Sequence, residues 1–318
     1  MKGLAACTCV AANYLSFARV LADSFRKFHP DIPFYVMVGD RGEPGALLQR
    51  ETVRTLCIED IEVPDLSRML LRYDRKQVIV AMKPAVMRHL LERGHETVLF
   101  LDPDMLVTGA LDPVLAAVRE HALTLSPHAG PKLADGSDPQ RERALLYAGI
   151  YNGGLIGATR REETLRFLRW WEGRLRTHCV EAVRQGLHFD QRWLDLAPGF
   201  VGDLHLVRDD GCNAAYWSLA DLEVRRTPEG WTVDGAPLRL FHFSGYSPAR
   251  PELVTRHVPG LMVDQMGEAA ELFRRYAALL REAGWAETAN EPWPWDGWRH
   301  QWRRVLVQWR RVRPYRPF

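Results

Sequence analysis

The chain has 318 residues, of which 47% are hydrophobic and 26% charged, and its formal net charge is +2. A chain of this length can bury an ample core in one large domain or two, and its near balance of charge excludes a global attraction to nucleic acid. No apolar run approaches the roughly 18 residues that a membrane helix requires.

Strand and helix patterns alternate through the first half of the chain. Residues 4–10 and 34–38 are predicted strands, and the amphipathic period between them predicts a helix over 16–28. Helical periodicity returns over 77–92, and the continuous apolar run at 97–101 is typical of a buried strand. This alternation predicts an α/β fold with a mostly parallel, doubly wound sheet flanked by helices.

The second half shows fewer regular patterns. A helix opens at Asp112, and residues 127–143, rich in Gly, Pro, Asp and Ser, are predicted to form a loop over a site. No element is assigned to 211–231, where the pattern is irregular. The remaining predicted elements are strands over 155–158 and 238–243 and helices over 162–178 and 266–283.

A domain boundary is predicted near residue 287, giving one large domain over 1–287 and a tail over 288–318. Residues 291–297, Glu-Pro-Trp-Pro-Trp-Asp-Gly, have the composition of a linker. After Asp296 the chain has seven arginines and no acid, and apolar residues recur at helical spacing. These are Trp298, Trp302, Val305, Leu306, Trp309 and Val312. The tail is either a helix docked on the core or an amphipathic helix that lies on an anionic membrane surface.

Five cysteines are spread along the chain without the paired spacing of a metal-binding motif, and their odd number argues against a disulfide framework. They are Cys7, Cys9, Cys57, Cys179 and Cys212. We therefore expect a reduced, cytoplasmic protein, peripheral at the inner face of the membrane if the tail binds lipid.

Two carboxylates, Asp102 and Asp104, directly follow the apolar run at 97–101. They occupy the carboxyl end of a predicted strand, where open α/β sheets bind their ligands. Two close carboxylates repel each other unless a cation lies between them, and hard oxygen ligands suit Mg²⁺ or Mn²⁺. Taken alone, the pair is equally consistent with a solvated turn at the end of the strand.

Two patches before the acid pair carry candidate binding residues. Asn13-Tyr14 follows the first strand, where the ring could stack on a nucleobase, or where Asn could cap a helix while Tyr packs. Lys83 lies inside an otherwise apolar helical pattern. A lysine there either meets phosphate or extends its ammonium to water.

Further patches follow the acid pair. In Tyr151-Asn152-Gly153-Gly154 the glycines would let the backbone approach a ligand, although a plain turn explains them as well. Asp190-Gln191 follows a Phe, and His242 lies on a short apolar strand, where a histidine is either a ligand or a satisfied core residue.

In this order the motifs resemble those of the retaining GT-A glycosyltransferases of the glycogenin and bacterial lipooligosaccharide galactosyltransferase type, over residues 4–248. The resemblance implies a GT-A, Rossmann-like fold with a C-terminal helical extension. It also implies transfer of a sugar from a nucleotide-sugar donor, with a UDP-sugar as the first expectation, to a glycan or lipid-linked acceptor. Mn²⁺ or Mg²⁺ would be the cofactor, and no nucleic acid would bind.

The resemblance also assigns expected roles to residues. Metal ligands would be Asp102, Asp104 and His242, and the residues at the reacting face would be Asp190 and Gln191. Donor-binding residues would be Asn13, Tyr14, Lys83, Asn152, Gly153, Gly154 and Gly245.

The chain departs from this pattern at Pro248, where the family usually has a diphosphate-binding lysine. The phosphate charge would then be met by Arg250 or Lys83, and the base need not be uracil. The departure leaves a non-catalytic sugar-nucleotide-binding protein as an alternative. A haloacid dehalogenase-type phosphohydrolase is a weaker one, because its Asp-x-Asp normally follows the first strand and has Thr or Val where this chain has Leu106.

Overall fold

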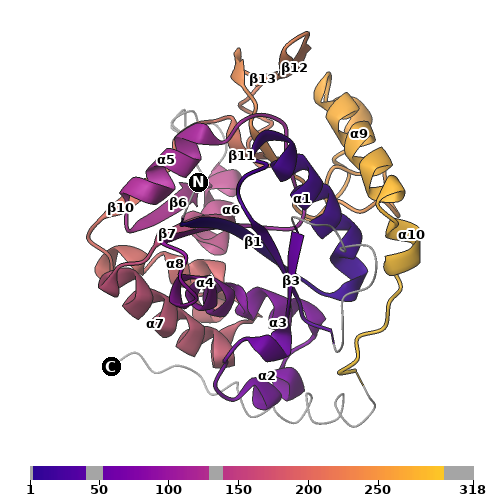
Figure 1. Cartoon of the computed structure of the whole chain (residues 1–318). Coiled ribbons are helices and arrows are strands. Elements are labelled where there is room, and N and C mark those ends of the chain that lie inside the picture. The colour runs from indigo at the N-terminus through magenta and orange to yellow at the C-terminus, as the bar shows by residue number, and fades with distance from the viewer. Residues whose placement is uncertain (1–2, 41–52, 129–138, 297–318) are drawn as a thin grey trace.

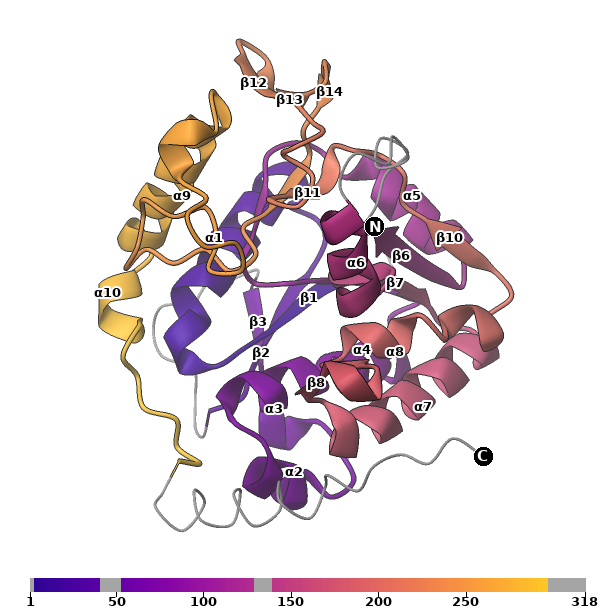
Figure 2. The ribbon, with the colours of Figure 1, turned by 180° about the vertical axis from the view of Figure 1, so that it is seen from behind.

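A mixed β-sheet with helices on both faces forms the centre of the computed structural model, which describes residues 3–40, 53–128 and 139–296 (Figures 1 and 2). Within these residues its strand order is β10-β6-β7-β4-β1-β2-β3, and β7 alone runs antiparallel to its neighbours. The strands are β1 (Leu4–Val10), β2 (Phe34–Val38), β3 (Val53–Cys57), β4 (Thr97–Leu101), β6 (Leu123–Pro127), β7 (Tyr151–Thr159) and β10 (Leu204–Leu206). The predicted α/β fold with a mostly parallel sheet is confirmed.

The helices that cover the two faces pack into separate apolar clusters. One face carries α1 (Leu15–Phe28) and α5 (Asp112–Glu120). The other carries α2 (Leu66–Arg72), α3 (Arg75–Ala81), α4 (Lys83–Glu92) and α7 (Glu162–His178). The crossovers from β1 and into β4 therefore run on opposite faces, which opens a crevice between the carboxyl ends of these two adjacent strands.

Two predicted elements differ from the observed ones near this crevice. The single helix expected over 77–92 is divided at Met82 into α3 and α4, because Pro84 lacks the N–H that would continue the ladder and is tolerated only in a first turn. Residues 151–154 are part of β7 and not a turn. Their glycines lie inside a strand, where glycine marks a close approach of neighbouring groups.

A second, three-stranded sheet lies beside the crevice and contains β11 (Cys212–Ala215), β15 (Leu240–His242) and β5 (Met105–Val107). The turn after β4 leads directly into β5, which pairs antiparallel with β15 so that Met105 lies opposite His242. The segment left unassigned over 211–231 thus contains β11 and the start of a small projecting sheet (Figure 1). That sheet consists of β12 (Val224–Thr227), β13 (Gly230–Val233) and β14 (Ala236–Pro237).

Some of the remaining elements contribute residues to the pocket at the crevice, and others form the C-terminal part of the described chain. They are α6 (Pro139–Ala148), β8 (Glu181–Ala182), β9 (Leu187–His188), α8 (Gln191–Leu194), α9 (Ala269–Glu282) and α10 (Trp285–Thr288). The loop expected over 127–143 is wrong for 139–143, which begin α6, and its residues 129–138 lie outside the described part. None of the described helices combines the length and the apolarity needed to cross a bilayer.

Residues 291–296 pack against the domain instead of forming the expected linker. Trp293 and Trp295 are buried in the same apolar cluster as α3 and α4. Trp295 Nε1 donates a hydrogen bond to the carbonyl oxygen of Gly39, at the end of β2, and Arg75 lies over the Trp293 ring. The ordered contacts therefore extend past the predicted boundary near 287. The predicted tail helix lies outside the described residues.

Candidate active site

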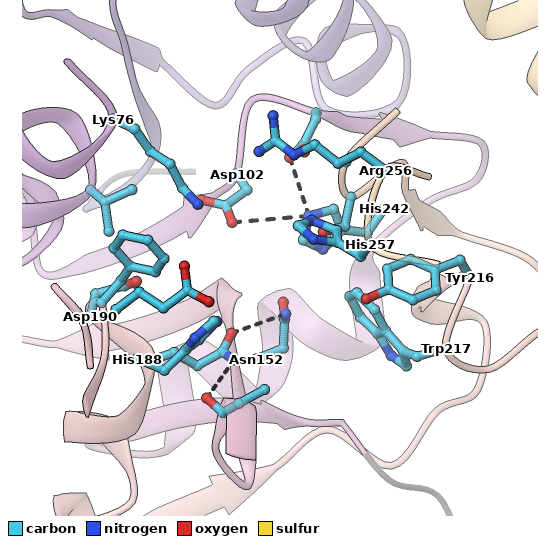
Figure 3. A pocket seen from close by; sticks show the side chains of 18 of the residues that line it. Lys76, Asp102, Asn152, His188, Asp190, Tyr216, Trp217, His242, Arg256 and His257 are labelled. Carbon is cyan, nitrogen blue, oxygen red and sulfur yellow. Dashed lines mark hydrogen bonds and ion pairs between the residues drawn. The ribbon is translucent and has the colours of Figure 1, made fainter. Parts of the chain in front are cut away.

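A pocket of about 1520 Å³ opens at the carboxyl ends of β1 and β4. Ten of the twelve predicted site residues line it: Asn13, Tyr14, Lys83, Asp102, Asp104, Asn152, Asp190, Gln191, His242 and Gly245. The other two, Gly153 and Gly154, contact lining residues: Gly153 lies against Asp190, and Gly154 lies against His242. The fold therefore gathers residues from six separate segments of the chain around one cavity (Figure 3).

Asp102, Asp104 and His242 form a cluster in which one ligand atom of each lies within 4.8 Å of the others. His242 Nε2 is 3.2 Å from Asp104 Oδ1 and 4.0 Å from Asp102 Oδ2 (Figure 3). The pairing of β5 with β15 produces this approach, and the Phe243 N–H donates to the carbonyl oxygen of Asp104. Two carboxylates and one imidazole nitrogen are a suitable donor set for Mn²⁺ or Mg²⁺.

The other ring nitrogen of His242 contacts a residue that the sequence did not indicate. His242 Nδ1 is 3.1 Å from Asn213 Oδ1 on β11, and Asn213 Nδ2 donates to Ser126 and Asn152. Asn213 lies in an irregular segment at a β-bulge, where no periodic pattern marks it.

Lys83 joins the acid pair to the opposite wall of the pocket. Its ammonium is 2.9 Å from Asp102 Oδ1, 3.0 Å from Asp190 Oδ2 and 2.9 Å from the carbonyl oxygen of Gly153. Burial opposes its charge, but the two carboxylates outweigh burial and raise its pKa above the ordinary value. The ammonium thus has two carboxylates and one carbonyl oxygen around it, which favours a positioning role over phosphate binding.

Gly153 and Gly154 are required where they are because their neighbours leave no room for a side chain. A Cβ at Gly153 would lie 2.7 Å from Asp190 Oδ2, and one at Gly154 would lie 2.8 Å from His242 Cε1. The Gly153 N–H donates to Gln191 Oε1, whose Nε2 donates to the carbonyl oxygen of Ala148. Gln191 thus joins the backbone of β7 to that of Ala148, with both ends of its amide bonded to the protein.

Asn152 is held by a complete set of hydrogen bonds. Its Oδ1 accepts from the Gly154 N–H, and its Nδ2 donates to Gln191 Oε1 and to His128 Nε2. Burial lowers the pKa of His128 to about 4, so this histidine is neutral and its Nε2 can accept. His128 is a second site residue that the sequence did not indicate.

The end of the pocket next to β1 contains Asn13 and Tyr14. One face of the Tyr14 ring is covered by Phe17, with centroids 4.5 Å apart, and Tyr14 is half-buried at the pocket wall. The Asn13 side-chain oxygen is buried and has no hydrogen-bond partner among the described residues. Since Asn13 lines the pocket, this unpartnered acceptor is compatible with a hydrogen-bond donor on a ligand.

Of the two cations expected to replace the missing lysine, Lys83 lines the pocket but is already engaged by Asp102 and Asp190, and Arg250 is not at the site. Pro248 is buried, and Arg250 is exposed, pairs with Glu252 and is not among the residues that line the pocket. Instead, Lys76 and Arg256 line it, and neither has an ion pair within the described part of the chain (Figure 3). Burial lowers the pKa of Lys76, and Arg256 is the next largest cause. Carboxylates of Asp190, Glu181 and Asp74 oppose this shift without forming an ion pair with Lys76. Two cations near each other at a pocket wall favour an anionic ligand.

Comparison with known proteins gives distant similarities. No family model matches the chain. It is similar to two uncharacterized proteins of Bacillus subtilis (strain 168): YfnF, at 23% identity over 246 residues (76% of this chain and 80% of that protein), and YfnD, at 22% identity over 251 residues (76% and 77%).

Solved structures similar to the chain include two glycosyltransferases. One is the galactosyltransferase LgtC in complex with donor and acceptor sugar analogs, with a TM-score of 0.48, 17% identity, and coverage of 92% of this chain and 98% of that one. Another is the glycosyltransferase GlyE of Streptococcus pneumoniae TIGR4, with a TM-score of 0.47, 14% identity, and coverage of 92% and 66%.

Proposed function

We propose that this protein is a metal-dependent glycosyltransferase of the GT-A type that moves a sugar from a nucleotide-sugar donor to a glycan or lipid-linked acceptor, with retention. The observation that carries the proposal is the cluster of Asp102, Asp104 and His242 at the wall of a large pocket, tied through Lys83 to Asp190. A divalent cation held by the cluster would neutralise the charge that develops on a departing diphosphate.

The cations at the pocket would bind the rest of the diphosphate. Lys76 and Arg256 are its candidate partners, because both line the pocket without a carboxylate partner within the described residues. They would take the place of the lysine that Pro248 replaces. Asn13 and Tyr14 would then receive the nucleoside, Asn13 by a hydrogen bond and Tyr14 by stacking of its ring.

Asp190 is the candidate for the reacting face. Its carboxylate is almost fully buried, and Lys83 lies 3.0 Å away to keep it in place. A carboxylate at this position would stabilise the oxocarbenium-like sugar of the transition state. Both routes to retention are compatible with one such carboxylate. One is a covalent sugar–enzyme intermediate, and the other is attack by the acceptor on the same face of the sugar from which the leaving group departs.

The direct test is a screen of nucleotide sugars with and without Mn²⁺, read by release of nucleoside diphosphate. We expect Mn²⁺-dependent hydrolysis or transfer with one donor and none in chelator. A protein that binds the donor and returns it unchanged with metal present would be a sugar-nucleotide-binding protein. Release of phosphate from simple phosphate esters would instead indicate a phosphohydrolase.

Asp190 and Gln191 are expected to act on turnover more than on nucleotide binding. Asp190→Asn should lower turnover by about 10²-fold, and Gln191→Ala should lower it in the same direction by loosening the Gly153 backbone. Calorimetry with nucleoside diphosphate should show nearly unchanged affinity in both. Arg250→Ala, at an exposed position, is the control. Equal losses in binding and rate would show that the two residues are only structural.

The tail is expected to bind anionic membranes through its tryptophans and arginines. Each cation near an anionic leaflet contributes about 1 kcal/mol, and the attraction is screened by salt. Sedimentation with anionic liposomes should pellet the full chain, less at high salt, and should leave a chain ending at Asp296 in solution. This end point keeps Trp293 and Trp295 in the core. Equal sedimentation of both chains would contradict membrane binding by the tail.

A further inference from the structure

The amide of Asn213 can be oriented from a single backbone hydrogen bond. The Gly154 N–H can only donate, so the side-chain atom of Asn152 that it contacts at 2.9 Å is the oxygen. This oxygen also lies 3.1 Å from Asn213, and the atom of Asn213 that faces it must therefore be the Nδ2 donor. The remaining atom of the Asn213 amide is its Oδ1 acceptor.

This orientation determines which nitrogen of His242 carries the proton. Asn213 Oδ1 lies 3.1 Å from His242 Nδ1, and an amide oxygen can only accept. Nδ1 must then donate, so in the neutral ring the lone pair is on Nε2. Nε2 is the nitrogen 3.2 Å from Asp104 Oδ1. A carboxylate oxygen and a nitrogen lone pair at this distance repel unless a proton or a metal ion lies between them, and a ligating histidine presents its lone pair in this way.

The backbone of Asn213 also indicates that its side chain is needed there. Its φ is +65°, in the left-handed region that glycine adopts without strain, and the β11–β15 register shifts at this residue. The side chain is only 5% exposed. Asparagine is one of the few residues other than glycine that tolerate this region, and here its amide contacts His242, Ser126 and Asn152.

We propose that Asn213 is a positioning residue for the metal site: it fixes the Nδ1–H form of His242 and couples that ring to Asn152 on β7. This inference rests on the metal site of the proposed function. Hydrogen bonds to the second nitrogen of a ligating histidine are worth about 10- to 100-fold in metal affinity.

Three variants separate positioning from support of the fold. Asn213→Gly removes the amide at a φ that suits glycine, Asn213→Asp keeps an acceptor for His242 Nδ1, and Ser126→Ala removes a partner of Nδ2 alone. Mn²⁺ affinity is measured by calorimetry without donor, and the melting temperature is measured in chelator.

We expect Asn213→Gly to bind Mn²⁺ about 10- to 100-fold more weakly while its melting temperature in chelator stays near that of the wild type. Asn213→Asp and Ser126→Ala should keep Mn²⁺ affinity within about tenfold of wild type. Wild-type affinity in Asn213→Gly, or equal losses in the glycine and aspartate variants, would overturn the positioning role. Absence of Mn²⁺ binding by the wild type would instead overturn the metal site itself.

Discussion

Asp104→Asn is expected to lower Mn²⁺-dependent donor turnover by about 10³-fold, because losing one of two anionic ligands removes several kcal/mol of charge stabilisation. Asp104 is the acid closest to His242 Nε2 and has no ion pair to Lys83 within the described residues, so nothing else there takes over its role. Asp102→Asn and His242→Ala should act in the same direction. The measurement is the rate of nucleoside diphosphate release at saturating Mn²⁺.

Two controls accompany this measurement. Asp31→Asn removes a carboxylate at an exposed position outside the pocket and should leave the rate unchanged. Addition of a chelator to the wild type should abolish turnover as the substitution does. Full activity in chelator, or an Asp104→Asn rate close to that of the wild type, would be incompatible with a metal-dependent mechanism.

Lys83→Met is expected to lower the free energy of unfolding by about 3–5 kcal/mol, which is the usual cost of leaving buried charges without their partner. The substitution keeps the length of the side chain but leaves Asp102, Asp190 and the Gly153 carbonyl without their shared donor. Urea unfolding in chelator measures the effect without any contribution from bound metal.

The matched control for this experiment is Lys27→Met, at an exposed position on α1, for which the change should stay within about 0.5 kcal/mol. If Lys83→Met were as stable as the control, the three contacts of the ammonium would not hold the two acids together. Turnover of Lys83→Met should also fall, because Asp102 and Asp190 lose their fixed separation.

Regular patterns led to the parts of the site that lie on strands. The apolar run of β4 placed Asp102 and Asp104 at a carboxyl end, and the structure has the strand at the predicted residues. The position of the two acids could be predicted because a strand buried on both faces is a continuous apolar run, and the end of the run marks the end of the strand. His242 came from the family resemblance, since nothing in its local pattern separates a ligand from a core histidine.

Other parts of the site depend on geometry that has no periodic pattern. Asn213 lies at a bulge, and Arg256 follows β15 in an irregular segment, so neither could be predicted. Lys83 was noticed as a lysine in an apolar helical pattern, but only the structure shows that its ammonium lies between two carboxylates and a carbonyl oxygen. The division between α3 and α4 was missed because apolar residues continue at helical spacing across Met82.

The hydrogen bond from Trp295 to Gly39 joins residues 256 positions apart in the chain. A ribosome that adds about 5–20 residues per second needs about 13–50 s to make the intervening polypeptide. During this time the apolar residues of β2 and α3 lack their contacts with Trp293 and Trp295. A nascent chain halted before residue 293 should therefore expose this apolar surface to chaperones, and the part of the pocket wall that Asp296 forms is added only after these tryptophans have been made.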